Sequence, residues 1–292
     1  MVDTFSEADT RKQTWEKDIK GFAAKRYVMK ELVTTTTGSA WNNSFYQKTA
    51  TSLTGGTGSA VQGIPRGADF PFVERGVTLR NAIILQHGGE GVIYWQDILT
   101  SNIAAEIETI SDVTDAVVYS VDNKIYDTLS ESNTPSTINT VAITAGYEWD
   151  SATLANRDPI TDLLKCVEAI STDRYPILSS GRGFVAMNEG TYTYLLNNSK
   201  VINHPTFKVS GESENGLVGS ILRLNIYVTP VVTNDKVLVG VAKTCGTWVQ
   251  TQPLTVDVII EPQKKYTIRA SEIGVCQLTD PESLCLLTNV RA

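Results

Sequence analysis

The chain has 292 residues, of which 41% are hydrophobic and 20% are charged, and its formal charge at pH 7 is -7. The acidic balance, with a pI of about 5.0, argues against broad binding to a phosphate backbone, which needs clustered Lys and Arg. No apolar run approaches the roughly 20 residues of a membrane-spanning helix, and the polar, acidic first ten residues do not resemble a signal peptide. We therefore expect a soluble, folded protein that is made in the cytoplasm.

The first 33 residues mix seven basic with six acidic side chains. Their few apolar residues recur at helical spacing, at Trp15, Ile19, Phe22 and Ala23. Such a marginal amphipathic helix has little to bury by itself. We interpret 1–33 as an arm that orders by docking on something else, and the alternative is a frayed terminus.

Residues 34–67 are rich in Thr and Gly and poor in large apolar side chains. Long segments of this kind are uncommon inside compact domains and are usually functional, so we expect a hairpin or loop that projects from the body. The glycines between Gly55 and Gly58 resemble a phosphate loop, but no Lys-Ser or Lys-Thr follows them. Nucleotide binding is therefore not expected there.

Strand signals come next in the chain. Residues 70–85 are rich in β-branched and aromatic side chains, and 91–95 form a second short run of this type. Between them lies His87-Gly-Gly-Glu-Gly91, which we interpret as a turn.

The most regular pattern is the segment 102–129. Its apolar residues, from Ile103 to Leu129, fall in steps of three and four, and the acidic residues between them, Asp122 included, cannot face a core unpaired. Asn102 is a plausible N-cap, and Pro135 prevents the helix from continuing much further. A helix of this length is roughly 40 Å long and needs an extended sheet or a second long element against it. Periodicity alone fits a core helix of an ordinary α+β enzyme equally well.

Short elements alternate after this helix. Asp158 and Pro159 predict a helix start, with a buried face of Ile160, Leu163, Leu164, Val167 and Ile170. A second helix over 188–197 opens with an Asn cap. Strands are expected at 137–149, 183–187, 217–232 with a break near Pro230, 236–241, 247–261 and 266–278. The predicted class is α+β with mostly antiparallel strands.

Candidate catalytic groups are scarce. The two histidines, His87 and His204, lie in no metal-ligand spacing, and there is no Gly-x-Ser-x-Gly motif. The four cysteines are far apart and are expected as buried free thiols, with Cys166 in a helix core: Cys166, Cys245, Cys276 and Cys285. We expect no enzyme, no catalytic, cofactor-binding or metal-binding residues and no cofactor.

Several segments in order resemble the major capsid proteins of tailed double-stranded DNA viruses of bacteria and archaea, which have the HK97 fold. The passage from 64–74 through 91–97 into the long helix resembles the step from projecting loop to spine helix. Phe184-Val-Ala-Met-Asn-Glu-Gly-Thr-Tyr192 resembles a strand and helix of the apical domain. Residues 217–230 and 247–287 resemble the strands that follow.

The resemblance implies an HK97-like α+β capsid fold with an N-terminal arm, an extended loop, a spine helix in a peripheral domain and an apical domain. The implied division is 1–33 arm, 34–80 extended-loop hairpin, 81–136 peripheral domain with the spine helix, 137–240 apical domain, 241–265 returning peripheral strands and 266–292 closing strand of the apical domain. The arm and the loop are then expected to find their cover on neighbouring copies.

The implied function is a structural major capsid protein of the virion. It would assemble with itself, in the host cytoplasm, into the hexamers and pentamers of an icosahedral shell enclosing double-stranded DNA without sequence-specific binding. Expected partners are a portal, a separate scaffolding protein if any, and decoration proteins where present, with no membrane. The first alternative is an encapsulin-type nanocompartment shell around a cargo enzyme, and the second is an enzyme of unknown class that uses the histidines with scattered acids. Crosslinking through Lys48 is a minor possibility that the resemblance raises.

Overall fold

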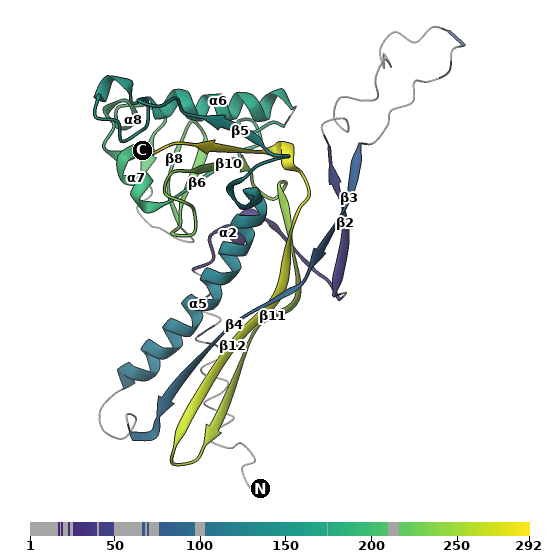
Figure 1. Ribbon diagram of the computed structural model, residues 1–292, viewed down its shortest axis with the longest axis vertical. Helices are drawn as coiled ribbons and strands as arrows, with labels where there is room; N and C mark the ends of the chain where they lie inside the picture. Colours follow the sequence, from purple (N-terminus) through teal and green to yellow (C-terminus); the bar gives the residue numbers. More distant parts are fainter. Residues whose placement is uncertain are drawn as a thin grey trace.

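The computed structural model describes residues 17, 19, 23, 26–39, 41–49, 66–67, 69, 76–96, 103–173, 175–209 and 216–292, with side chains of the long helix described from 108 onward. The described strands form a four-stranded sheet, a seven-stranded sheet and a separate two-stranded hairpin. One long helix lies along the narrow four-stranded sheet, and the seven-stranded sheet lies beyond one end of that helix (Figure 1). The α+β class predicted from the sequence is confirmed.

The four-stranded sheet has the order β1-β11-β12-β4. β1 pairs with β11 in parallel, and the other pairs are antiparallel. The two longest strands, expected at 247–261 and 266–278, are confirmed with small shifts at their ends. The bounds are β1 Thr34–Thr37, β4 Leu85–Tyr94, β11 Gly246–Glu261 and β12 Lys265–Leu278.

The long helix α5 spans Ile103–Leu129, as predicted. The described residues of the apolar stripe predicted from the sequence are at most 5% exposed: Ile110, Val113, Val117, Val121, Ile125 and Leu129. They pack against the inward row of the four-stranded sheet, which includes Val256, Ile268 and Ala270. The expected N-cap, Asn102, lies outside the described residues. One acidic residue departs from the expected polar face, because Asp122 is 2% exposed.

The turn expected at 87–91 is wrong, because these residues are the middle of strand β4. The glycines are there for close packing. A Cβ on Gly91 would lie 2.5 Å from Thr109 Cγ2 and 2.8 Å from Val113 Cγ2, both on α5. The absence of a side chain therefore lets the helix approach the strand, which is a use of glycine that resembles a turn signal in the sequence.

The seven-stranded sheet has the order β5-β13-β10-β6-β9-β8-β7 and is mixed parallel and antiparallel. Its central strands β6 and β10 are buried on both faces. One face, with Phe184 and Leu238, joins the core under α5, and the other, with Val185 and Val239, packs under helix α6. The bounds are β5 Asn139–Ala142, β6 Gly183–Met187, β7 Lys208–Val209, β8 Leu217–Ile221, β9 Leu224–Val228, β10 Val237–Val241 and β13 Leu284–Thr288.

Three helices cover this sheet, α6 Pro159–Thr172, α7 Glu189–Leu196 and α8 Ser199–Ile202, and three short 3-10 turns, Glu131–Asn133, Leu154–Asn156 and Pro281–Ser283, connect elements. The Asp158 carboxylate accepts from the Thr161 backbone N–H, so the predicted cap of α6 is confirmed. Asn188 caps α7 in the same way through Gly190 N–H. The expected buried face of α6 is wrong at Leu164, which is 43% exposed, while Cys166 takes a core position.

Three other strand predictions need correction. The strand expected at 137–149 is only β5, because the chain turns at Gly146 with φ of 88°. The break expected near Pro230 lies instead at Leu222 and Arg223, which form the β8–β9 turn with positive φ. The expected single closing strand 266–292 is two strands, because β12 belongs to the four-stranded sheet and only β13 enters the seven-stranded sheet.

The described part of the arm packs on its own chain. Ile19, Ala23 and Leu32 are at most 2% exposed and belong to the core under α5, and helix α2 spans Met29–Leu32. The expectation that the arm finds its cover on a neighbouring copy is therefore wrong for these residues. Trp15 and Phe22 lie outside the described residues.

Candidate functional site

The hairpin of β2 (Asn42–Lys48) and β3 (Val77–Ile83) is the most exposed apolar element of the described chain. It projects away from both sheets (Figure 1). In this hairpin Tyr46 lies opposite Leu79, and Asn42 lies opposite Ile83. Residues directly opposite each other are on the same face, and so is every second residue along a strand. Tyr46, Leu79 and Ile83 therefore share one face. Tyr46 is 64% exposed, Leu79 58% and Ile83 63%. This hairpin face, defined by Tyr46, Leu79 and Ile83, has an apolar surface that one copy of the chain leaves uncovered.

The base of the hairpin is fixed to the segment that joins the two large sheets. Lys48 Nζ lies 2.8 Å from Asp280 Oδ2, and Lys48 N–H donates to Thr279 O at 2.9 Å. Asp280 is 4% exposed, so the loop is attached at a buried charge. Lys48, considered above for crosslinking, is thus engaged within its own chain.

The arm is held to α5 by a buried carboxylate. Asp122 accepts from the Val28 N–H at 2.8 Å and from the Lys30 N–H at 3.1 Å, so α5 supplies the cap that α2 does not have in its own N-terminal residues. Burial raises the pKa of Asp122 to about 6, against the lowering effect of these backbone N–H groups. An ion pair between Arg26 and Asp115 adds a second contact at the surface.

A second carboxylate, Glu272 on β12, anchors the same segment to the sheet. It is 0% exposed and accepts from Tyr27 Oη at 2.6 Å and from Lys30 Nζ at 2.6 Å. Two donors from β11 complete the set, Trp248 Nε1 at 3.0 Å and Gln250 Nε2 at 2.9 Å. Burial, the Glu272 charge and its hydrogen bond raise the pKa of the Tyr27 hydroxyl. We call Glu272 with these four donors the arm anchor. It joins the arm, β11 and β12 in one buried polar cluster.

Sequence reasoning missed both carboxylates that hold the arm, Asp122 and Glu272. A signal existed for Glu272, because the alternation through Ile268 and Ala270 places it on the inward face of β12. No local pattern marks Asp122, whose partners lie more than 90 positions away in the sequence.

The residues considered for catalysis are not brought together. His87 lies under α5, where its Nδ1 is 2.8 Å from Ser120 Oγ, and His204 lies at the surface beyond α8, with Nδ1 2.7 Å from Thr206 Oγ1. The four cysteines are buried and free. Burial raises the pKa of the Cys245 thiol to about 12, which disfavours the nucleophilic thiolate.

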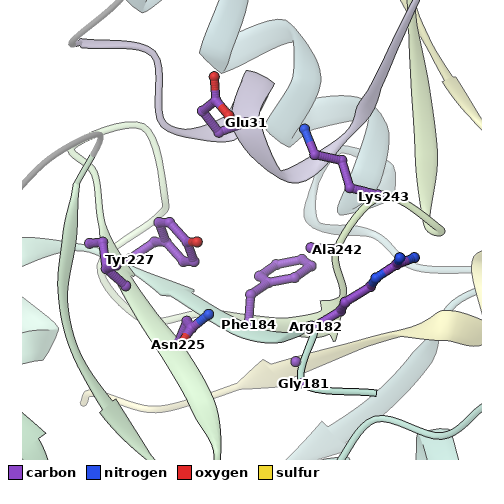
Figure 2. Close-up of a pocket in the computed structure, with 10 residues that line it drawn as sticks. Glu31, Gly181, Arg182, Phe184, Asn225, Tyr227, Ala242 and Lys243 are labelled. Atoms are coloured by element: carbon purple, nitrogen blue, oxygen red, sulfur yellow. The ribbon is translucent and has the colours of Figure 1, made fainter.

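A cavity of about 410 Å³ lies between α2 and one end of the seven-stranded sheet (Figure 2). Phe184, Tyr227 and Asn225 come from the sheet, and Glu31 and Lys243 stand on the opposite side of the opening (Figure 2). Burial and the nearby Glu31 charge raise the pKa of Tyr227. The described lining includes no histidine, cysteine, serine or threonine.

Two other searches concern only the described residues. No group of three or more His, Cys, Asp or Glu side chains there has the arrangement of a metal site. In that same part of the chain, no helix combines the length and the apolar character needed to cross a bilayer.

No protein-family model matches this chain, and no curated protein is similar to it in sequence. Solved structures do match along nearly its whole length. The virus-like particle from Pyrococcus furiosus is 13% identical with a TM-score of 0.61, over 95% of this chain and 99% of the other. The capsid of cyanophage P-SCSP1u is 14% identical with a TM-score of 0.65, over 90% and 88%.

The chain has the HK97-like capsid fold. The holo-SrpI encapsulin complex from Synechococcus elongatus PCC 7942 also matches, with 13% identity and a TM-score of 0.55 over 89% of this chain and 85% of the other. The long helix expected as the spine of this fold is α5. The fold predicted from the sequence is confirmed.

Proposed function

We propose that the chain is a shell-forming capsid protein that assembles with copies of itself. The observation that carries this proposal is the hairpin face, because Tyr46, Leu79 and Ile83 lie exposed on a projecting element. Covering an exposed Leu or Ile side chain contributes about 1.5–3 kcal/mol, so a shell that buries this face in every copy gains from each contact. The match in fold to assembled particles over most of the chain supports the same conclusion.

We propose further that the shell is icosahedral, built of hexamers and pentamers, and encloses double-stranded DNA in a virion. Portal, scaffolding and decoration proteins would be its partners. The formal charge of -7 fits a lining that holds DNA without binding it tightly. The proposed division keeps 1–33 as the arm and 137–240 as the apical domain. We propose the four-stranded sheet as the core of the peripheral domain, so β1 and β12 now belong to that domain. The extended loop, expected over 34–80, then begins only after Thr37, and the returning peripheral strands end at about 278 instead of 265.

An encapsulin-type shell is the second candidate, because an encapsulin complex is among the structural neighbours. The content of the particles separates the two. Particles purified from the producing cells and treated with nuclease should hold protected double-stranded DNA if the proposed virion function is right. A stoichiometric enzyme in nucleic-acid-free particles would favour the encapsulin function instead.

Assembly is tested on the expressed full-length chain by electron microscopy and light scattering. The wild-type protein should form shells, tubes or capsomers. The double variant Leu79→Asp, Ile83→Asp should remain small with an unchanged circular dichroism spectrum, because both side chains are exposed within one copy. Thr78→Asp is the matched control, since Thr78 is exposed on the other face of the same strand. A wild-type protein that stays monomeric under all conditions, or a double variant that assembles normally, contradicts the proposal.

A further inference from the structure

His87 lies within reach of the arm anchor. On strand β4 it stands directly opposite Glu272 in the β12 ladder, so the two side chains share the inward face of the sheet. Its ring centroid is 6.0 Å from that of Trp248, which donates to the same carboxylate. Ser120 Oγ on α5 is 2.8 Å from Nδ1. The imidazole therefore lies between strand β12 and helix α5, the two elements that hold the arm.

The second ring nitrogen of His87, Nε2, has no partner in the part of the chain that the structure describes. The side chain is 7% exposed, and among the described residues Nε2 is buried without a hydrogen-bond partner. The charged groups that face it are Glu272 from β12 and Lys124 from α5. Burial lowers the pKa of His87, the Glu272 charge opposes this, and the Lys124 charge adds to it. The neutral imidazole is thus the form that the folded chain prefers.

Protonation of His87 would add one more hydrogen-bond donor that competes for the Glu272 carboxylate. A protonated imidazole donates from both nitrogens, and the Nε2–H then needs an acceptor inside the core. The carboxylate opposite it already accepts from Tyr27 and Lys30 of the arm. A Glu272 oxygen that accepts from His87 binds Tyr27 or Lys30 less strongly.

We propose that His87 is an acid-sensitive release for the N-terminal arm, in which the protonated imidazole competes with Tyr27 and Lys30 for Glu272 and loosens residues 26–32 from the sheet. The device lies within one chain and does not depend on the proposed shell. It would let a drop in pH free a segment that is otherwise held by its own subunit.

The sign of the effect follows from linkage. Because the folded-state pKa of His87 is below its unfolded value of 6.5, docking is fully stable above that pH and weakens as the pH falls through it. Asp122 acts in the opposite direction, because its raised pKa makes the docked arm take up a proton near pH 6. The variant Asp122→Asn removes this second titration and leaves the His87 effect alone.

Hydrogen exchange read by mass spectrometry tests the proposal on the full-length chain. In Asp122→Asn, corrected protection of a peptide covering 26–32 should fall by up to about tenfold for each pH unit below about 6.5, until the lowered pKa of the docked His87 is reached. Adding His87→Gln should abolish this fall. His204→Gln is the matched control, since it removes the only other histidine, at an exposed site, and should leave the fall intact.

Two results would overturn the proposal: protection at 26–32 that does not change with pH in Asp122→Asn, or a fall in that background that persists after His87→Gln. If His87→Gln does not fold, the wild-type chain gives an independent readout, because its two histidines give only two labelled imidazole signals. The buried signal should titrate together with the loss of protection. A buried signal that shifts only on global unfolding excludes the release.

Discussion

Replacing Lys30 by Met tests whether the arm anchor holds the arm through charge. The change keeps most of the aliphatic stem but removes the ammonium that lies 2.6 Å from Glu272 Oε1 and 4.4 Å above the Tyr27 ring. The Lys30 side chain is 15% exposed and that of Glu272 is 0% exposed, so the buried carboxylate is left with no ion-pair partner among the described residues. Removing one member of a buried pair costs about 3–5 kcal/mol.

Three other donors to Glu272 survive the substitution, from Tyr27, Trp248 and Gln250, so we expect the lower end of that range, about 3 kcal/mol. The assay is urea unfolding of the unassembled chain followed by circular dichroism. In the double variant Lys30→Met, Glu272→Gln the loss should be smaller than the sum of the two single losses by about 1 kcal/mol or more, because the neutral amide needs no counter-charge. Lys264→Met, which breaks only an exposed pair with Glu261, is the control and should change little. A Lys30→Met loss below about 1 kcal/mol, or strict additivity in the double variant, refutes the reasoning.

Two further predictions follow from packing and from titration. Leu129→Ala should lower the free energy of unfolding by about 2–5 kcal/mol, since the side chain is fully buried under the sheet, whereas Leu164→Ala, at a 43% exposed site, should change it by less than about 0.5 kcal/mol. Equal losses in denaturant unfolding would show that the helix faces are assigned wrongly. Burial, helped by the hydrogen bond and charge of Asp173, raises the pKa of Glu282 to about 7. Because the folded state keeps a proton that the unfolded state releases, this group's contribution to stability declines as the pH rises from about 4.5 to about 7. The difference in Tm between Glu282→Gln and the wild type should therefore grow over that window, and a constant difference would exclude the shift.

The sequence predicted those parts of the fold whose signals are local. The 3.6-residue period predicted α5 correctly, because a long helix that packs on a sheet needs one apolar face, whichever sheet covers it. The caps at Asp158 and Asn188 were predictable for a similar reason, since each side chain bonds to a backbone N–H two or three residues later. The long alternating strands β11 and β12 also carry their own signal, because one face of each packs on the helix.

The failures arose where distant residues decide the conformation. Glycines at 88, 89 and 91 look like a turn in the sequence, yet they lie in strand β4, where the missing side chain of Gly91 lets α5 approach closely. The arm carries too few apolar residues to predict its own place, and its docking depends on Asp122 and Glu272, which no local pattern connects to it. Leu164 shows the reverse case, an apolar residue of the right period that the sheet below does not reach.

By itself, then, the sequence determined the longer helices α5, α6 and α7, the long strands and the overall class, because periodicity and caps act over a few residues. Only the tertiary structure decided which apolar faces are satisfied within one chain and which remain for a partner. The described arm residues Ile19, Ala23, Met29 and Leu32 are buried by their own subunit, whereas the hairpin face of Tyr46, Leu79 and Ile83 is not. Burial is a property of the neighbours that folding brings to a residue, and those neighbours lie far away in the chain.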